Sequence, residues 1–235
     1  MKIKTIALSI LALVTACSKS TDTIQPQPVT TSTQPHVWFF GDSMTLGVGA
    51  STPDNRWTSK LSTQKNWVEV NGGTSYETLI TASENTGYTH FFEKYQGAII
   101  TKPANGKYIF ISYGANDCAF NFADYTPALF STQLQTIITF ANSKGWTNNS
   151  IVVLCGYFEN NSSWSADWGG QSIPAATMTR YNSFITAAQT VANNNAGVYF
   201  VNPFNTYDIT GMADQVHAND KGHAAIAAYV ASLIP

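Results

Sequence analysis

The chain has 235 residues, of which 44% are hydrophobic and only 11% are charged, and its formal net charge is −2. This length is enough for one α/β domain with a full hydrophobic core. Because there is no excess of basic residues to neutralise a phosphate backbone, the composition argues against nucleic acid as a partner.

Residues 1–17 have the features of a targeting segment. Lys2 and Lys4 give a positive start, and residues 6–14 form an apolar run that is too short to span a bilayer. The run ends at Val14-Thr15-Ala16-Cys17, which resembles the lipobox of bacterial lipoproteins, whose cysteine is lipidated and becomes the N-terminus. The resemblance implies an exported protein anchored through a lipid on Cys17, at the periplasmic or cell-surface face of a membrane. The alternative is a plain secretory signal that is cleaved near a cysteine.

Residues 18–35 contain Ser, Thr, Gln and three prolines, with almost no apolar side chains. Such a segment cannot bury enough surface to order itself, so we expect a semi-extended tether. The remaining residues, 36–235, show no internal repeat and no further break in composition, and they are expected to form one domain.

Within this domain, apolar runs typical of strands alternate with segments of helical length. The predicted strands are residues 37–40, 67–70, 108–112, 151–155 and 198–201, and the predicted helices are residues 56–65, 76–83, 127–144, 174–193 and 221–233. Residues 85–106 have no clear period, because Gly and Pro interrupt it, and we expect a loop or a short insertion there. Five strands separated by helices predict parallel pairing with right-handed crossovers, and therefore a three-layer α/β/α sandwich.

Small and polar residues follow four of these elements. They are Gly41-Asp42-Ser43, Asn71-Gly72-Gly73-Thr74-Ser75, Tyr113-Gly114-Ala115-Asn116-Asp117 and Asp214-Gln215-Val216-His217. In open parallel sheets the carboxyl ends of the strands meet along one edge, where ligands bind. Taken alone, Ser43 also fits an N-cap, and Asn116 with Asp117 also fits a turn.

Together these residues supply the parts of a serine hydrolase. A serine hydroxyl becomes nucleophilic when a histidine takes its proton and a carboxylate holds that histidine in the right tautomer. Ser43, His217 and Asp214 can fill these three places. Backbone N–H groups near Ser43 and Gly73, with the side-chain amide of Asn116, can bind a developing oxyanion.

The four motifs, in this order and each at a predicted strand end, resemble the SGNH or GDSL-type hydrolase family over the whole domain. The resemblance implies a flavodoxin-like fold with a five-stranded parallel sheet of order 2-1-3-4-5. It implies the following roles: nucleophile and oxyanion donor, Ser43; further oxyanion donors, Gly73 and Asn116; general base, His217; its acidic partner, Asp214. Gly72 stays open as an alternative to Gly73.

No other chemistry has a matching pattern. The sequence lacks a Cys/His cluster with metal-ligand spacing and a glycine-rich phosphate loop, so neither a metal nor another cofactor is expected. Asp42 is expected to cap or brace the serine turn, and His223 to be structural. Cys118 and Cys155 end neighbouring strands, and they fit either a disulfide or two buried free thiols.

The substrate is less well defined by the sequence. Residues 160–170 are polar and include Trp164 and Trp168, which can either offer flat faces to sugar rings or simply cover the core. With a surface location, this favours a serine esterase that removes acetyl or other short acyl groups, with a small molecule or a polysaccharide as the substrate. The alternatives are a lysophospholipase-type lipid esterase and a non-catalytic glycan-binding protein on the same scaffold.

Overall fold

The structure is a computed structural model. The residues that it describes are 33–81, 88–120, 123–156, 175–203, 206–207, 209–214 and 216–235. The predicted targeting segment and most of the predicted tether lie outside this range, as does the segment with Trp164 and Trp168. Among the described residues, none of the helices is both long and apolar enough to cross a bilayer.

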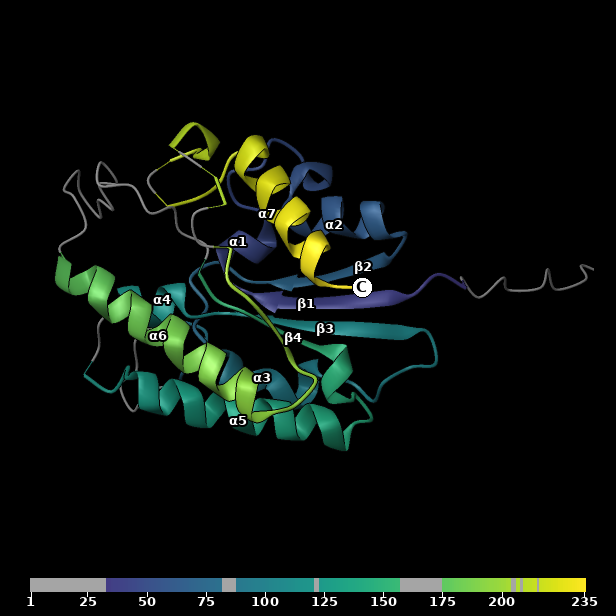
Figure 1. Cartoon of the computed structure of the whole chain (residues 1–235), viewed down its shortest axis with the longest axis horizontal. Helices are drawn as coiled ribbons and strands as arrows, with labels where there is room; N and C mark the ends of the chain where they lie inside the picture. The colour runs from purple at the N-terminus through teal and green to yellow at the C-terminus, as the bar shows by residue number, and fades with distance from the viewer. Residues whose placement is uncertain are drawn as a thin grey trace, which may run out of the picture. The chain divides into compact units, whose positions relative to one another are not determined.

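Five parallel strands form one sheet of order β2-β1-β3-β4-β5, which confirms the predicted fold (Figure 1). The strands are β1 His36–Gly41, β2 Val68–Gly73, β3 Gly106–Ser112, β4 Ile151–Leu154 and β5 Tyr199–Val201. The α-helices are α1 Ser43–Leu46, α2 Trp57–Lys65, α3 Phe91–Ala98, α4 Ala115–Ala119, α5 Pro127–Ser143, α6 Ala175–Asn194 and α7 Asp220–Leu233. Short 3-10 turns occur at Pro53–Asn55, Asn148–Ser150 and Ile209–Gly211.

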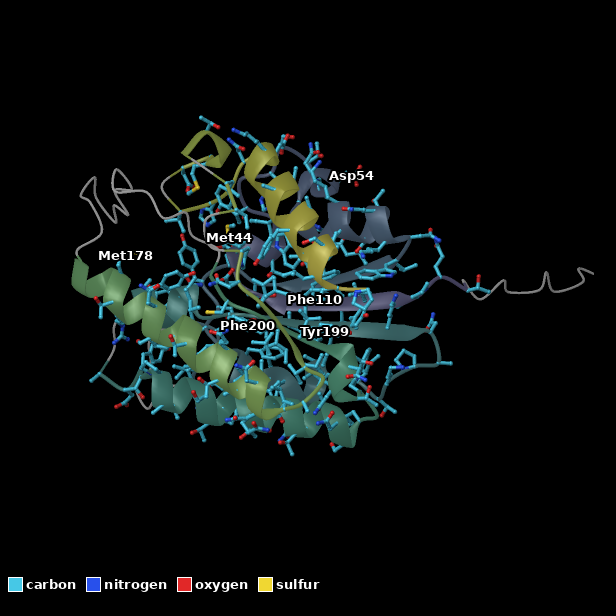
Figure 2. All side chains as sticks on the ribbon, in the orientation of Figure 1. Met44, Asp54, Phe110, Met178, Tyr199 and Phe200 are labelled. Carbon is cyan, nitrogen blue, oxygen red and sulfur yellow. The ribbon has the colours of Figure 1, made fainter. Side chains whose placement is uncertain are left out.

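The helices cover the sheet on both sides, with α2 and α7 on one face and α3, α5 and α6 on the other (Figure 1). Alternate strand residues face the two layers, as the period of two in a strand requires. Phe39 and Phe110 are fully buried with Trp57 on the α2/α7 side, and Met44 belongs to the same cluster (Figure 2). Trp38 and Phe40, for example, face the opposite layer.

One predicted helix is wrong, and three α-helices of the structure were not predicted: α3 and the short helices α1 and α4. Over residues 76–81, within the predicted helix 76–83, the chain forms a turn and then an isolated bridge between Thr78 and His90. Phe91–Ala98 form α3 in the region where no period was evident. Gly97 interrupts the helical pattern of this segment in the sequence. A Cβ added at Gly97 would meet no atom within 4 Å, so packing does not require a glycine there.

The sheet register brings the predicted motifs to one edge. Gly41 at the end of β1 pairs with Gly73 of β2 on one side and with Ser112 of β3 on the other. The residues that come next in the chain are therefore neighbours in space, which is the arrangement expected at the carboxyl edge of a parallel sheet.

Candidate active site

Ser43 is the first residue of the short helix α1, directly after β1. Asp42 caps this helix, since its Oδ1 accepts the N–H of Met44 at 2.9 Å. Asp42 is buried, and this burial raises its pKa to about 7 despite the Met44 N–H; the nearby carboxylates of Asp117 and Glu77 add to the rise. The predicted role of Asp42 as the cap of the serine turn is confirmed. The N–H of Ser43 itself lies in the first turn, where helix amides have no intrahelical acceptor.

The side chains of Ser43, His217 and Asp214 form one hydrogen-bonded chain. Ser43 Oγ lies 3.0 Å from His217 Nε2, and His217 Nδ1 lies 2.8 Å from Asp214 Oδ2. A carboxylate only accepts hydrogen bonds, so Nδ1 carries the proton and donates a hydrogen bond to Asp214. The lone pair of Nε2 then faces the serine hydroxyl, as a general base requires.

The loop that holds His217 and Asp214 is shaped by its own hydrogen bonds. Asp214 Oδ1 accepts the N–H groups of Val216 and His217, each at 2.7 Å. Partial burial opposes ionisation of Asp214, but the N–H and ring of His217, together with the Val216 N–H, hold the pKa of this carboxyl below its usual value. Asp214 therefore stays ionised and fixes the imidazole in place.

Asn116 lies in α4, directly after β3, and its side chain is anchored to the neighbouring segment. Its Nδ2 donates one N–H to the carbonyl oxygen of Glu77 at 3.0 Å. A primary amide has two N–H donors, so one remains for another acceptor. Asp117 is buried below it and accepts the N–H groups of Ile80, Leu79 and Gly114 at 2.8, 3.2 and 3.1 Å. Asn116 and Asp117 thus hold residues 77–80 against α4.

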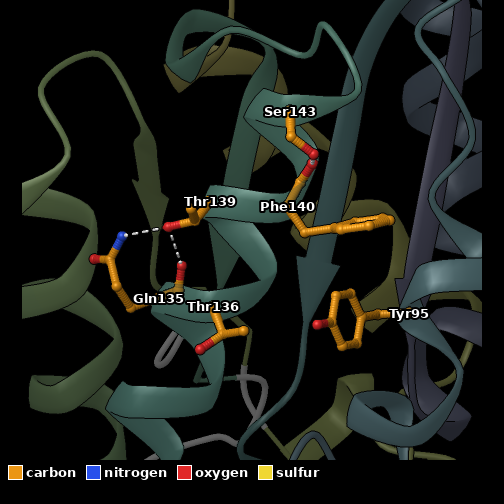
Figure 3. Close-up of a pocket in the computed structure, with 6 residues that line it drawn as sticks. All are labelled: Tyr95, Gln135, Thr136, Thr139, Phe140 and Ser143. Carbon is orange, nitrogen blue, oxygen red and sulfur yellow. Dashed lines mark hydrogen bonds between the residues drawn. The ribbon is translucent and has the colours of Figure 1, made fainter.

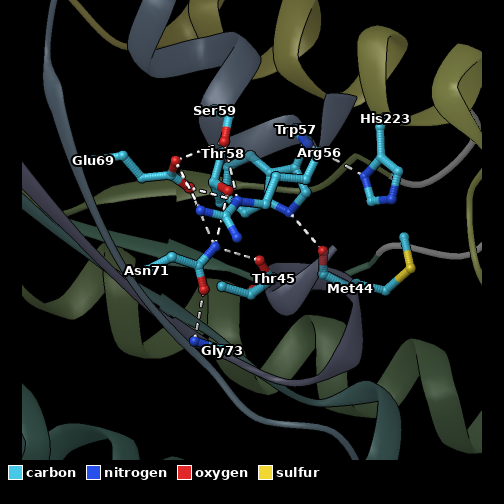
Figure 4. Close-up of polar contacts among 10 residues, drawn as sticks. All are labelled: Met44, Thr45, Arg56, Trp57, Thr58, Ser59, Glu69, Asn71, Gly73 and His223. Carbon is cyan, nitrogen blue, oxygen red and sulfur yellow. Dashed lines mark hydrogen bonds and ion pairs between the residues drawn. The ribbon is translucent and has the colours of Figure 1, made fainter. Parts of the chain in front are cut away.

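Gly73 is placed as predicted, but its amide is already used. The Gly73 N–H donates to Asn71 Oδ1 at 2.9 Å (Figure 4). Asn71 Nδ2 in turn donates to the carbonyl oxygen of Thr45 in α1 at 2.7 Å and to Thr58 Oγ1 at 3.0 Å. Asn71 therefore joins the end of β2 to both α1 and α2, and it occupies the N–H that the sequence suggested for an oxyanion.

Tyr76 is a residue that sequence reasoning missed. The N–H of Glu77 donates to the carbonyl oxygen of Thr74 at 3.3 Å, closing a turn in which Tyr76 has φ = +61°. This turn lies beside the nucleophile, because the Thr74 N–H donates to the carbonyl oxygen of Gly41 at 2.9 Å. Within the described part of the chain, the N–H of Tyr76 has no hydrogen-bond partner. The sequence did not predict this turn, because the residue with a positive φ at the third position of a turn is usually glycine and here it is tyrosine.

A polar cluster of Arg56, Ser59 and Glu69 joins β2 to the start of α2 (Figure 4). Arg56 binds Glu69 through Nε and a terminal nitrogen at 3.0 and 3.1 Å, and Ser59 Oγ donates to the same carboxylate at 2.6 Å. Burial alone would raise the pKa of Glu69, but the hydrogen bonds from Arg56 and Ser59 outweigh it and lower that pKa. His223 of α7 is buried next to this cluster and accepts the Trp57 N–H through Nδ1 at 3.3 Å, which fits a structural role.

Other candidate chemistry finds little support in the described residues. Cys118 and Cys155 are both buried and form no disulfide, so of the two alternatives the structure has the pair of thiols. Among the residues that the structure describes, no three His, Cys, Asp or Glu side chains are arranged to hold a metal.

A hollow of about 390 Å³ lies beside α5 and is lined by Tyr95, Gln135, Thr136, Thr139, Phe140 and Ser143 (Figure 3). The hydroxyl groups of Thr136, Thr139 and Ser143 donate to carbonyl oxygens of their own helix, so these three do not converge on a ligand.

Residues 39–225 match the GDSL-like Lipase/Acylhydrolase family, a range that contains every residue of the site described above. The chain belongs to this family. Its members are ester hydrolases, so the chain is classed with esterases, and the resemblance seen in the sequence is confirmed at this level. The sequence matches none of the curated proteins with which it was compared.

Several solved structures share the fold at low sequence identity. The aryl esterase of M. smegmatis aligns with a TM-score of 0.61 at 17% identity, covering 84% of this chain and 97% of that one. A carbohydrate acetylesterase family member from Sinorhizobium meliloti aligns with a TM-score of 0.60 at 15% identity, over 86% and 97%. A carbohydrate esterase family 2 enzyme from Corynascus thermopiles, solved with its carbohydrate-binding domain, gives 0.62 at 14%, over 85% and 65%.

Proposed function

We propose that the protein is a serine esterase that hydrolyses short acyl esters through an acyl-enzyme. The observation that carries this proposal is the pair of contacts on His217, with Ser43 Oγ 3.0 Å from one ring nitrogen and Asp214 2.8 Å from the other. Residues 174 positions apart meet in the geometry that a nucleophile and its base need. A glycan-binding protein would have no use for this alignment.

The reaction follows from these contacts. Ser43 Oγ attacks the acyl carbon while its proton passes to His217 Nε2, and the ionised Asp214 stabilises the imidazolium that forms. The imidazolium then gives its proton to the departing alcohol. Water enters, loses a proton to His217 and attacks the acyl-serine, which releases the acid and restores the serine hydroxyl.

The oxyanion formed in both steps needs donors that are aimed at it beforehand. We assign the backbone N–H of Ser43, the second N–H of the Asn116 amide and the backbone N–H of Tyr76. The Tyr76 N–H takes the place expected for Gly73, because an oxyanion at Gly73 would have to displace the 2.9 Å bond to Asn71. Losing one partly buried hydrogen bond to gain another gives little net stabilisation.

We propose acetyl or similarly short acyl groups as the substrate class, carried on a carbohydrate or another small alcohol. Two of the structural neighbours are described as carbohydrate esterases, which supports this choice at the level of a shared fold. The rate on p-nitrophenyl esters of increasing chain length tests it: a maximum at acetate or propionate is expected, and a maximum at long chains would favour a lipid esterase instead.

The variants Ser43→Ala, His217→Ala and their double mutant test the reaction itself. Each single change should remove nearly all turnover of p-nitrophenyl acetate, and the double mutant should be no worse, because the two residues act as one unit. Ser232→Ala, an exposed serine on α7, is the matched control and should keep full activity. Normal turnover in Ser43→Ala would overturn the proposal.

We also propose that the mature protein is exported and anchored through a lipid on Cys17. The proposal is supported by the order of charged start, apolar run and cysteine in residues 1–17. Mass spectrometry of protein purified from membranes should find a diacylglyceryl group on Cys17 as the first residue. An unmodified N-terminus at another position would contradict it.

A further inference from the structure

Three aromatic side chains form a stack near the candidate active site. Tyr88 and Phe120 are parallel, with ring centroids 4.3 Å apart and an angle of 9° between their planes. Tyr76 continues the series, 6.1 Å from Tyr88 and tilted by 32°. Tyr76 is 58% exposed and Tyr88 is 40% exposed, and Tyr76 is the most exposed large hydrophobic residue in the described part of the chain.

Both ends of the stack are tied to the residues proposed for catalysis. Tyr76 directly precedes Glu77, whose carbonyl oxygen accepts the Asn116 side chain at 3.0 Å. Phe120 lies one helical turn after Asn116, and its N–H donates to the carbonyl oxygen of Asn116 at 3.0 Å. Both ends of the stack therefore lie close to Asn116, whose side-chain amide we assign to binding the oxyanion.

Folding gives no reason for the ring of Tyr76. The residue has φ = +61°, a conformation that is unfavourable for a bulky side chain and that Gly or Asn adopts more easily. With more than half of its surface exposed, the side chain gains little from burial. A strained position that presents an aromatic ring to solvent beside a catalytic group is the kind of outlier that points to a function.

The charge around the stack indicates what kind of ligand it suits. Two cations of the described chain lie near the stack. Arg180 donates to the carbonyl oxygens of Cys118 and Tyr125 at 3.0 and 2.6 Å. The Nζ of Lys94 lies 2.5 Å from Glu77 Oε1 and donates to Thr74 Oγ1 at 3.3 Å. Glu77 is fully buried, so the positive charge of Lys94 is balanced by a carboxylate of the protein itself. Among the described residues, the cations near the stack are therefore already bound by groups of the protein, which favours a neutral ring over an anionic group.

We propose that Tyr76, Tyr88 and Phe120 form a subsite for a neutral six-membered ring on the substrate, a pyranose or a phenyl group joined to the ester cleaved at Ser43. This proposal rests on the proposed esterase function and specifies the alcohol part of its substrate. The π face of Tyr76 attracts the C–H groups of a sugar ring, and it equally accepts a phenyl ring in an offset stack. The ring would bind next to Asn116, with the ester carbonyl directed toward Ser43.

Two variants of the whole protein test the subsite. Tyr76→Asn removes the ring and tolerates the positive φ, and it keeps the backbone N–H assigned to the oxyanion. Tyr88→Leu removes the middle of the stack, and Tyr88→Phe restores it. Tyr229→Leu, on α7 and 36% exposed, is the control for loss of an exposed tyrosine elsewhere. Circular dichroism and a urea titration confirm that each variant is folded.

The measured quantities are kcat and KM for a monoacetylated methyl pyranoside, phenyl acetate and acyclic ethyl acetate. In Tyr76→Asn and Tyr88→Leu, KM for at least one ring ester should rise about three- to tenfold relative to ethyl acetate, with a smaller change in kcat, because stacking is lost equally from bound substrate and transition state. The ring ester that responds identifies the source of the ring, sugar or aryl. Tyr88→Phe and Tyr229→Leu should leave the ratio unchanged.

Equal changes for ring and acyclic esters in an active enzyme would overturn the subsite and leave the esterase proposal standing. A wild-type protein that hydrolyses none of the three esters would overturn both. The two failures are therefore distinguishable.

Discussion

Gly73→Ala tests whether the end of β2 must touch the helix that carries the proposed nucleophile. A Cβ at Gly73 would lie 2.2 Å from the backbone nitrogen of Leu46, and 2.7 Å from both Leu46 Cα and the carbonyl carbon of Thr45. Non-bonded carbon atoms pack at about 3.5–4.0 Å, so the 2.2 Å approach must open by about 1 Å or more. These three nearest atoms are all backbone, so rotating a side chain cannot relieve the contact and α1 itself must move.

This movement should cost both stability and rate. Overpacking of this kind costs about 1–3 kcal/mol of unfolding free energy. Because α1 begins at Ser43, a shift of about 1 Å at the nucleophile should lower kcat/KM about 10²-fold. Urea titration measures the first quantity, and initial rates on p-nitrophenyl acetate measure the second.

Gly97→Ala is the matched control, since a Cβ there meets no atom within 4 Å and the residue lies in α3. It should stabilise the protein by about 0.5–1 kcal/mol, as alanine does over glycine in helices, and leave the rate unchanged. If Gly73→Ala kept wild-type stability and a rate within twofold of wild type, the close approach of β2 and α1 would not matter as argued.

The remaining predictions concern single polar groups. Burial raises the pKa of Asp42 to about 7 from 3.8, so the folded state holds a proton that the unfolded state releases above pH 4, and stability should fall as pH rises from about 4 to 7. Asp42→Asn keeps the capping oxygen and removes this titration. In urea titrations, the unfolding free energy lost between pH 4 and pH 8 should therefore be smaller in the variant than in wild type by about 2–4 kcal/mol. Equal losses in the two proteins would contradict the burial argument. Asp214→Asn should lower kcat by about 10²–10⁴, because an amide no longer selects the Nδ1–H tautomer of His217. An unchanged kcat would show that Asp214 has no role in catalysis. Asn116→Ala should lower kcat by about 10²–10³ in steady-state assays with little change in KM, whereas a change in KM alone would make it a binding residue.

The parts of the fold that could be predicted are those in which local pattern and tertiary structure agree. Residues 37–40 are apolar throughout because β1 is a central strand covered on both faces, and such a run is plain in the sequence. Pro127 marked the start of α5 because the first turn of a helix needs no N–H there. The edge strand β2 was predicted to end at residue 70, since Asn71, Gly72 and Gly73 are poor strand formers that only the pairing with β1 holds extended.

The candidate site divides in the same way. The contact between Ser43, Asp214 and His217 could be predicted, because the proposed chemistry depends on side chains that the sequence displays and strand ends place them on one edge. The proposed oxyanion donors that come from the backbone depend on conformation instead. Two such features arise from the way β2 meets α1: the hydrogen bond from the Gly73 N–H to Asn71, and the left-handed turn at Tyr76. The residue types along this segment predict neither of them.

The most direct measurement is the reaction of the folded protein with a fluorophosphonate, followed by peptide mass spectrometry. If His217 Nε2 at 3.0 Å makes the hydroxyl of Ser43 nucleophilic, the label should be found on Ser43 alone and should be lost in His217→Ala and in protein unfolded with urea. A wild-type protein that stays unlabelled, or that is labelled at Ser43 as fast without His217, would contradict the serine hydrolase mechanism.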